Sequence, residues 1–228
     1  MLLTTTSVEQ YFAMPQSSLW LIPPQDNHPF NKSLKSLISE TIQSDFPRVP
    51  NDQLSFPPHV TLTSDIAPDA YGSDPQSWLD NLSLPAEFKK ERVEPDLNFE
   101  TIETGSQFFK KLYLRARKDE NLLKLAAATR RATGADTDTA KKWAESEFMP
   151  HLSLLYADIA EADVKKKIGL VELQLGWEFG SLFDCCGGTL AMGARLVLVD
   201  TSNKIRDWKV LASRDCPWVK WTMARGLI

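Results

Sequence analysis

FPPHVTLTSD (residues 56–65) places a histidine directly after two prolines and before alternating apolar and hydroxyl side chains. FMPHLSLLYAD (residues 148–158) repeats this frame, although the chain has only three histidines. The alternation, together with the β-branched residues, predicts that each stretch is a strand. Because neighbouring side chains of a strand point to opposite faces, each stretch presents an imidazole and a hydroxyl on the same face.

The first strand is expected to carry His59, Thr61 and Thr63 on one face, and the second strand His151 and Ser153. The apolar residues between them point the other way and are available to a core. Two such polar faces, brought together by symmetry, would form one site with two imidazoles and two hydroxyls.

The sequence around each motif is also repeated. Residues 17–65 begin with an apolar strand-like run, SSLWLIPP, and residues 108–158 begin with FFKKLYLRAR. Apolar residues at helical spacing follow each run and predict one helix in each repeat, carried by Leu34, Leu37, Ile38 and Ile42 and by Leu122, Leu125, Ala126 and Thr129. Pro47 marks the end of the first helix and Gly134 the C-terminal cap of the second. Trp20 precedes its histidine by 39 positions, and Tyr113 precedes its own by 38.

Two strand–helix–strand units predict an α+β fold with mainly antiparallel strands. We expect residues 1–228 to form a single domain with two pseudo-symmetric lobes, whose antiparallel sheets line a central cleft. Residues 17–65 and 108–158 would be the repeated parts.

The remaining segments carry weaker local signals. Between the motifs, Asp74 and Pro75 predict the start of a short helix, and the rest of that segment is expected to be a surface connection. Asp158 and Glu161 predict a capping box for a helix that carries Val164, Ile168 and Val171. A hairpin with strands at 189–199 and 207–212 follows, and the aromatic tail after it has no assigned structure. Residues 134–148 form either a lid or, more simply, a solvated helix end.

Composition excludes several classes of protein. The 228 residues are 43% hydrophobic and 25% charged, which is ordinary for a globular chain, and the net charge of −4 argues against binding duplex nucleic acid. No apolar run is long enough to span a bilayer, and the start lacks the features of a secretory signal. Three cysteines (185, 186 and 216) without metal-ligand spacing predict a reducing compartment and no metal site or cofactor.

Two imidazoles and two hydroxyls suit the hydrolysis of a phosphodiester. One histidine can deprotonate water while the other protonates the leaving oxygen, because the ordinary pKa of histidine lies near neutrality. The hydroxyls can donate hydrogen bonds to the phosphate oxygens. A strained cyclic phosphate is a favourable substrate for this small set. Our working assignment makes His151 the base and His59 the acid.

A single histidine in an apolar strand is more often structural than functional. Two histidines in matched repeats are poorly explained by chance, so we assign both to a site. His28 has no such frame and is expected to lie in a turn. Among the aromatic residues, Trp20 is expected in the core, whereas Phe46, Trp143 and Trp177 are candidates for stacking on a base.

PHVTLTSD and PHLSLLYAD resemble the twin His-x-[Thr/Ser]-x motifs of the two-histidine phosphoesterase superfamily. The opening SLWLIPP, the helix after it and the tyrosine five positions beyond His151 are similar to its fungal and plant cyclic phosphodiesterase branch. The resemblance covers residues 17 to about 199. The chain differs in having about sixteen residues before the first strand and a long segment between the motifs.

The resemblance implies a bilobal fold and hydrolysis of 2′,3′-cyclic nucleotides to 2′-phosphates. It also implies opening of ADP-ribose 1″,2″-cyclic phosphate, a step that follows tRNA splicing. Carried over by position, His59 and His151 are the acid–base pair and Thr61 and Ser153 bind phosphate. Tyr156 would contact phosphate or base, which requires a bulge or a strand end, because strict alternation turns it away from His151.

Two alternatives remain open from the sequence. One is a two-histidine enzyme that acts on RNA ends, such as a 2′-5′ RNA ligase-like protein, although the acidic balance disfavours long RNA. The other is a module that binds cyclic phosphates without turnover, which would not need two titratable groups. We expect a monomer in the cytoplasm with a small cyclic phosphate as substrate, and the resemblance also allows association with the Golgi.

Overall fold

The computed structural model describes residues 16–24, 28–47, 49, 56–90, 93–175 and 190–223. Within these ranges the strands are β1 (Ser17–Ile22), β2 (Val60–Ile66), β3 (Asp96–Thr104), β4 (Leu112–Ala116), β5 (His151–Leu155), β6 (Leu190–Asp200) and β7 (Lys209–Met223). The α-helices are α1 (Pro29–Ser36), α2 (Ile42–Asp45), α4 (Pro75–Asp80), α5 (Glu87–Lys90), α6 (Glu120–Arg130), α7 (Thr137–Ser146), α8 (Glu161–Lys165) and α9 (Ile168–Gln174).

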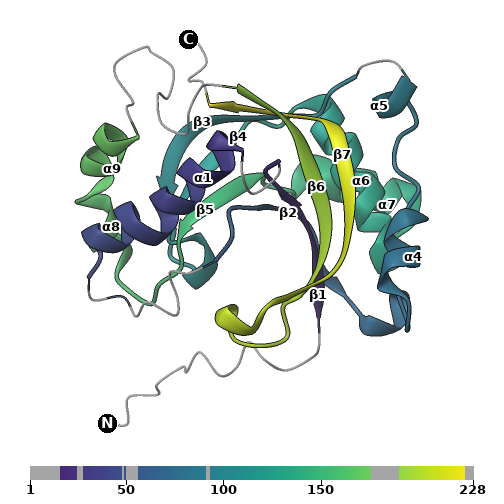
Figure 1. Ribbon diagram of the computed structural model, residues 1–228, viewed down its shortest axis with the longest axis horizontal. Coiled ribbons are helices and arrows are strands. Elements are labelled where there is room, and N and C mark those ends of the chain that lie inside the picture. Colours follow the sequence, from purple (N-terminus) through teal and green to yellow (C-terminus); the bar gives the residue numbers. More distant parts are fainter. Residues whose placement is uncertain are drawn as a thin grey trace.

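These strands form one closed sheet in the order β1-β2-β5-β4-β3-β7-β6. Neighbouring strands are antiparallel, except that β3 and β7 run parallel. Helices α1, α8 and α9 lie on one side of this sheet and α4 to α7 on the other (Figure 1). The predicted α+β class with mainly antiparallel strands is therefore confirmed. Two lobes with separate sheets are not confirmed, because β2 pairs with β5 and thereby joins both halves in one sheet.

The two motif strands lie side by side at the centre of this arrangement. β1 pairs with β2, β4 pairs with β5, and Val60 lies opposite Leu152 where β2 meets β5. The strand–helix–strand units of residues 17–65 and 108–158 are thus adjacent through the strands that carry the histidines.

The helix of the first repeat is interrupted rather than continuous. His28 caps α1 by accepting a hydrogen bond from the Phe30 amide (3.2 Å), so this histidine lies at a turn, as predicted. A π-helical turn at 37–41 separates α1 from α2 and shifts the helical register by one residue. All four residues predicted on its apolar side are buried, which preserves the expected contact with the sheet: Leu34, Leu37, Ile38 and Ile42.

Helix α6 of the second repeat follows its sequence pattern closely. The Asp119 carboxylate caps its first turn, and Gly134 takes the left-handed conformation (φ 85°) that ends the following 3-10 turn. Its predicted apolar side is buried, namely Leu122, Leu125, Ala126 and Thr129.

Residues 134–148 contain a separate helix rather than a lid or a helix end. Asp136 caps α7, and Ala140 and Ala144 are buried. Because α6 and α7 pack against one another (Figure 1), small residues at this contact let the two helices approach closely.

The hairpin and one of the two predicted helix caps differ from what the local sequence pattern predicts. Asp74 caps α4, as predicted, by accepting from the Ser77 amide, but Asp158 caps nothing, because α8 starts after Ala160. The last strand extends to Met223 instead of ending at residue 212, since the aromatic tail pairs with β3 and is buried there.

The start of one central strand and the existence of another also differ from the prediction. Residues 108–110 form a 3-10 turn, so β4 begins only at Leu112. The sequence pattern does not reveal β3.

None of the helices in the described ranges has the length and apolar character that crossing a bilayer requires.

Candidate active site

The two motif hydroxyls each have an aromatic partner on the neighbouring strand. Trp20 lies opposite Thr61, and Tyr113 lies opposite Ser153. Directly opposite residues point to the same face of a sheet. We call the face that carries these four side chains the histidine face, because Trp20 stacks on His59 and Tyr113 contacts His151.

A bulge follows the hydroxyl in each motif and ends the simple alternation. The register shifts by one residue at Leu62 in β2, so Thr63 lies opposite the buried Leu19 and points to the core face of the sheet. Thr63 there accepts a hydrogen bond from Arg130 on α6 (3.3 Å). The expectation that Thr63 shares a face with His59 is therefore wrong.

The matching bulge in β5 brings Tyr156 to the histidine face. The register shifts at Leu154, and β5 ends at Leu155. This supplies both the bulge and the strand end that the placement of Tyr156 requires. Its hydroxyl lies 3.3 Å from Nε2 of His59, so the second repeat contributes a side chain to the histidine of the first.

Each imidazole hydrogen bonds through Nδ1 with the backbone carbonyl two residues before it. Nδ1 of His59 lies 2.7 Å from the Pro57 carbonyl, and Nδ1 of His151 lies 2.8 Å from the Met149 carbonyl. A carbonyl only accepts, so the proton of each neutral ring is on Nδ1 and the lone pair is on Nε2, where that of His59 accepts from the Tyr156 hydroxyl. The prolines before the histidines favour an extended backbone at residues 57 and 149, which turns those carbonyls toward the rings.

Aromatic rings fix the plane of His59. The Trp20 ring stacks on it with centroids 3.8 Å apart and planes inclined by 15°. Phe56 stacks on Tyr156 at 3.9 Å and thereby supports the tyrosine that reaches Nε2. Trp20 was expected in the core; it is buried, but in a small separate cluster that belongs to the site.

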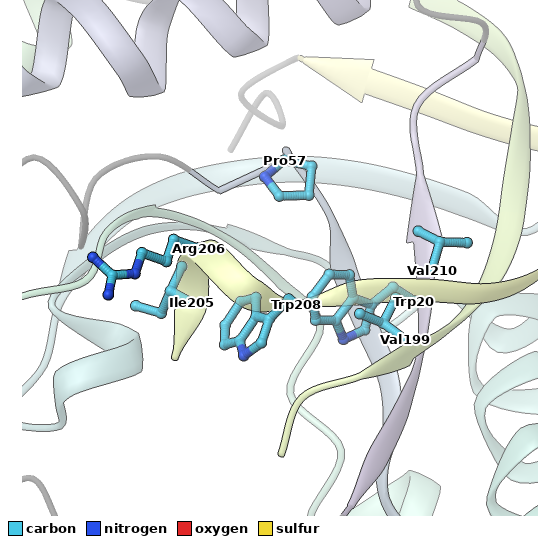
Figure 2. A pocket seen from close by; sticks show the side chains of 7 residues that line it. All are labelled: Trp20, Pro57, Val199, Ile205, Arg206, Trp208 and Val210. Atoms are coloured by element: carbon cyan, nitrogen blue, oxygen red, sulfur yellow. The ribbon is translucent and has the colours of Figure 1, made fainter. Parts of the chain in front are cut away.

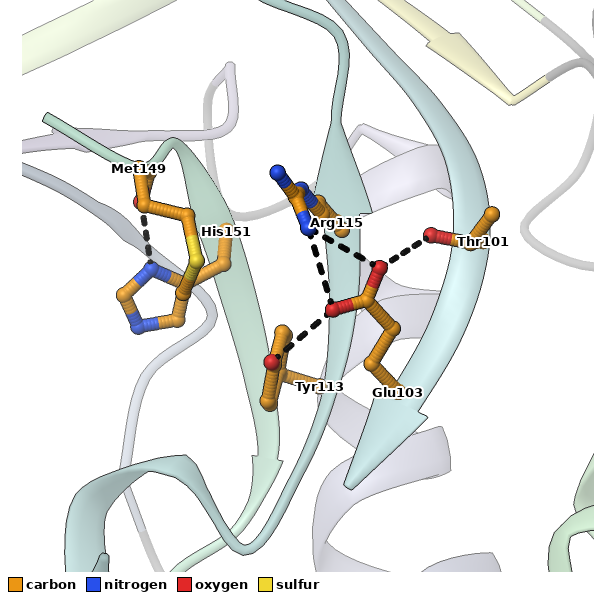
Figure 3. A network of polar contacts seen from close by, with 6 residues as sticks. All are labelled: Thr101, Glu103, Tyr113, Arg115, Met149 and His151. Atoms are coloured by element: carbon orange, nitrogen blue, oxygen red, sulfur yellow. Dashed lines mark hydrogen bonds and ion pairs between the residues drawn. The ribbon is translucent and has the colours of Figure 1, made fainter. Parts of the chain in front are cut away.

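A polar network lies beside His151 (Figure 3). The Glu103 carboxylate accepts hydrogen bonds from Tyr113 (3.0 Å), Thr101 (3.0 Å) and Arg115 (3.3 Å). The Tyr113 ring packs edge-on to His151 with centroids 5.4 Å apart. Burial raises the pKa of Tyr113 to about 12, with its hydrogen bond to Glu103 as a second cause, so its hydroxyl remains a donor.

The two motif hydroxyls differ in what they contact. Thr61 is half-buried, and its hydroxyl has no hydrogen-bond partner among the described residues. Ser153 is buried and donates to the Phe109 carbonyl at 2.9 Å. Burial raises the pKa of Tyr156, and the nearby Ser153 hydroxyl acts in the opposite direction.

Burial determines the charge of both imidazoles in the free protein. It lowers the pKa of His59 from 6.5 to about 4; the Pro57 carbonyl acts in the opposite direction, and the charge of His151 lowers the pKa further. Burial likewise lowers the pKa of His151 to about 4, against the Met149 carbonyl, while the Lys110 charge lowers it and Glu103 raises it. Both rings are therefore neutral at pH 7, whereas the sequence suggested one charged ring.

These pKa values predict a stability that falls in acid. Between pH 6.5 and 4 the unfolded chain protonates both histidines while the folded chain does not, so stability rises with pH in this window. For one histidine, lowering the pH from 7 to 5 should cost about 2 kcal/mol. Urea unfolding of the wild type and of His59→Asn at both pH values measures this, and the variant should lose less stability. Equal losses in the two proteins would contradict a buried neutral His59.

A pocket of about 230 Å³ is lined by Trp20 and Pro57, the two residues that stack on and hydrogen bond with His59 (Figure 2). Trp20 and Pro57 form its inner wall, and the turn between β6 and β7 supplies Trp208 and Arg206. Trp208 also contacts the rings of Trp20 at 5.4 Å and Phe109 at 6.2 Å, so this turn borders the histidine face. The sequence did not indicate its role, because the turn lies far from both motifs.

Other residues considered from the sequence lie elsewhere. Phe46 is buried beneath Lys167, and Trp143 packs under Arg130 on the core face, so neither stacks at the site. Trp177, Cys185 and Cys186 lie outside the described residues. Cys216 is buried, and its thiol donates to the Arg214 carbonyl. In the described part of the chain, no group of three or more His, Cys, Asp or Glu side chains is placed to hold a metal ion.

The known proteins that are similar to this chain are all described as cyclic phosphodiesterases. A family model for cyclic phosphodiesterase-like proteins matches residues 14–216. A 2′,3′-cyclic-nucleotide 3′-phosphodiesterase of Neurospora crassa is 36% identical over 216 residues, which cover 88% of this chain and 99% of that protein. Proteins with the same name from Phaeosphaeria nodorum and Yarrowia lipolytica are 38% and 30% identical, over 89% and 87% of this chain and 100% and 99% of their own lengths.

Proposed function

The chain belongs to the cyclic phosphodiesterase-like protein family, and from this premise we propose that it hydrolyses 2′,3′-cyclic nucleotides to nucleoside 2′-phosphates. The observation that carries the proposal is the pair of imidazoles whose Nδ1 atoms are anchored by backbone carbonyls, which leaves the Nε2 atoms unprotonated and able to accept a proton. The chain is accordingly a hydrolase, as its relatives are named.

Hydrolysis of the 3′ ester needs one proton removed from water and one delivered to the departing 3′ oxygen. In the free protein both imidazoles are neutral, so either can accept the proton of water. The anionic phosphate of a bound substrate favours protonation of an adjacent imidazole and so supplies the acid.

Coupling between the rings disfavours a second proton in the site. The charge of His151 lowers the pKa of His59, so protonation of one ring disfavours protonation of the other. A site with one protonated and one neutral imidazole is the combination that acid–base hydrolysis requires.

Thr61 and Ser153 are proposed to bind the non-bridging phosphate oxygens. The Thr61 hydroxyl is available to a ligand, and the Ser153 hydroxyl can turn from the Phe109 carbonyl to a stronger, charged acceptor. Tyr156 lies between Ser153 and His59 and can donate to the same phosphate. All catalytic steps use side chains of this chain.

We extend the proposal to ADP-ribose 1″,2″-cyclic phosphate, whose reacting group is also a five-membered cyclic phosphate on a ribose. This substrate would place the protein in the steps that follow tRNA splicing. We further propose that residues 1–228 act as one monomeric domain, because both repeats contribute to the same site.

Product analysis tests the proposed reaction directly. With EDTA present, the wild type should convert each of the four 2′,3′-cyclic mononucleotides to its 2′-phosphate. Chromatography against 2′- and 3′-phosphate standards identifies the product. A 3′-phosphate would contradict the regiochemistry, and activity that appears only with a divalent ion would contradict the two-histidine mechanism.

Removing the Tyr156 hydroxyl should give a moderate loss. Tyr156→Phe keeps the ring that stacks on Phe56 but removes the group beside Nε2 of His59. We expect kcat to fall about tenfold, because one hydrogen bond to a charged group contributes about 1.5–3 kcal/mol and two other hydroxyls remain. Steady-state kinetics measure the change. An unchanged kcat would exclude Tyr156 from the reaction.

A further inference from the structure

Arg115 lies directly beside His151 on the histidine face. The two residues are opposite one another on β4 and β5, a relation that places their Cβ atoms about 5 Å apart. The Arg115 side chain is 46% exposed and can therefore meet a ligand. The proposed hydrolysis assigns it no task.

Glu103 orients the guanidinium of Arg115. Its two carboxylate oxygens lie 3.3 and 3.4 Å from Nη1, and Thr101 and Tyr113 hold the same carboxylate from two further sides (Figure 3). A guanidinium has five N–H donors, and in the described part of the chain Nε and Nη2 have no protein partner.

A second cation completes the arrangement. Lys110 ends the 3-10 turn before β4, directly after Phe109, whose carbonyl accepts from Ser153, and its charge lowers the pKa of His151. Its ammonium group has no hydrogen-bond partner in the portion that the structure describes, and burial lowers its pKa. Lys110 and Arg115 bring two positive charges to the negative charge of Glu103, and Glu161, which also acts on Tyr113, is paired with Lys165, so this edge of the site is cationic.

Fold stability is a poor explanation for this cluster. An exposed ion pair contributes about 0–1 kcal/mol, and an ammonium group without a partner contributes less. An oriented guanidinium with free donors next to a reaction centre is instead suited to a phosphate, because it offers parallel hydrogen bonds as well as charge.

We propose that Arg115, oriented by Glu103 and assisted by Lys110, forms a second anion subsite that binds a non-reacting phosphate or diphosphate on the 5′ oxygen of the cyclic-phosphate ribose. This inference rests on the proposed function, because it takes the cyclic phosphate to lie between the imidazoles. The 5′ oxygen and the cyclic phosphate belong to the same ribose. A group attached to the 5′ oxygen is therefore separated from the imidazole of His151 by no more than the width of that sugar. The preferred substrates are therefore 5′-phosphorylated cyclic nucleotides rather than nucleosides with a free 5′ hydroxyl.

The test compares adenosine 2′,3′-cyclic phosphate with its 5′-phosphorylated derivative. The wild type should show a kcat/KM about tenfold higher for the 5′-phosphorylated substrate, because the added charge-assisted contact is partly exposed to solvent. In Arg115→Gln this preference should disappear, while activity on the unphosphorylated substrate stays within about threefold. Raising the salt concentration should reduce the wild-type preference.

Arg131→Gln is the matched control, since it removes the same charge from the turn after α6 and should keep the preference. Equal activity of the wild type on both substrates overturns the subsite, as does an equal loss on both in Arg115→Gln. If the wild type hydrolyses neither substrate, the proposed function fails. Calorimetric binding of adenosine 5′-monophosphate then tests the subsite, and equal affinity of wild type and Arg115→Gln overturns it.

Discussion

His59→Asn and His151→Asn are each expected to lower kcat for a 2′,3′-cyclic nucleotide at least about a hundredfold at pH 7. Each proton transfer by a positioned side chain contributes about 10²–10⁴ in rate. Asparagine places an amide donor near the position of Nδ1, where it can still reach the Pro57 or Met149 carbonyl. It has no titratable group at the position of Nε2, so the loss reports proton transfer rather than misfolding.

The double variant makes this test sharper. Acid and base act in the same step, so removing both should cost little more than removing one. His28→Asn is the control, because this histidine caps α1 and asparagine is a good capping residue. Initial rates with saturating substrate measure the effect, and circular dichroism checks the fold. Near-wild-type kcat in either single variant would end the two-histidine mechanism.

The sequence predicts the site well where the signal is local. Matched frames around His59 and His151 identify two strands, and the nearly equal spacing to Trp20 and Tyr113 reflects a real structural equivalence. Each of these aromatic residues lies opposite the hydroxyl of its repeat. Their contact with the imidazoles was not predicted, because periodicity indicates which face a side chain occupies only if the register of the pairing is known.

Bulges explain the errors around the motifs. One extra residue at Leu62 moves Thr63 to the core face, and one at Leu154 moves Tyr156 to the histidine face. Strict alternation predicts the opposite for both residues. A bulge depends on hydrogen bonds to the neighbouring strand, so the motif sequence alone does not specify it.

Contacts between distant segments account for the rest. The predicted connection between the motifs continues directly into β3, whose Glu103 orients Arg115 and holds Tyr113. The aromatic tail, to which the sequence assigns no structure, is the end of β7 that pairs with β3 and closes the sheet. Neither segment has a strong local pattern, since each is stabilised by its neighbours. The two-lobe expectation has the same origin, because the repeats are clear in the sequence whereas the strands that close the sheet are not.

Removing the phosphate donors gives the second large expected effect. Thr61→Val keeps the shape of the side chain, and we expect kcat to fall about 10²–10³-fold, the usual loss for one donor to transition-state charge. KM should change little, because a developing negative charge strengthens this hydrogen bond only as the reaction proceeds. Thr61→Ser restores the hydroxyl and should recover most of the activity.

Ser153→Ala should match this kinetic loss but differ in stability. Ser153 donates to the Phe109 carbonyl, so its removal leaves that acceptor unpaired and should cost about 1 kcal/mol. Thr61 has no such partner in the described part of the chain, so Thr61→Val should unfold at the same urea concentration as the wild type. A loss of activity in Thr61→Val that arises only from a higher KM would instead make the hydroxyl a ground-state contact. The imidazoles alone would then carry the catalysis.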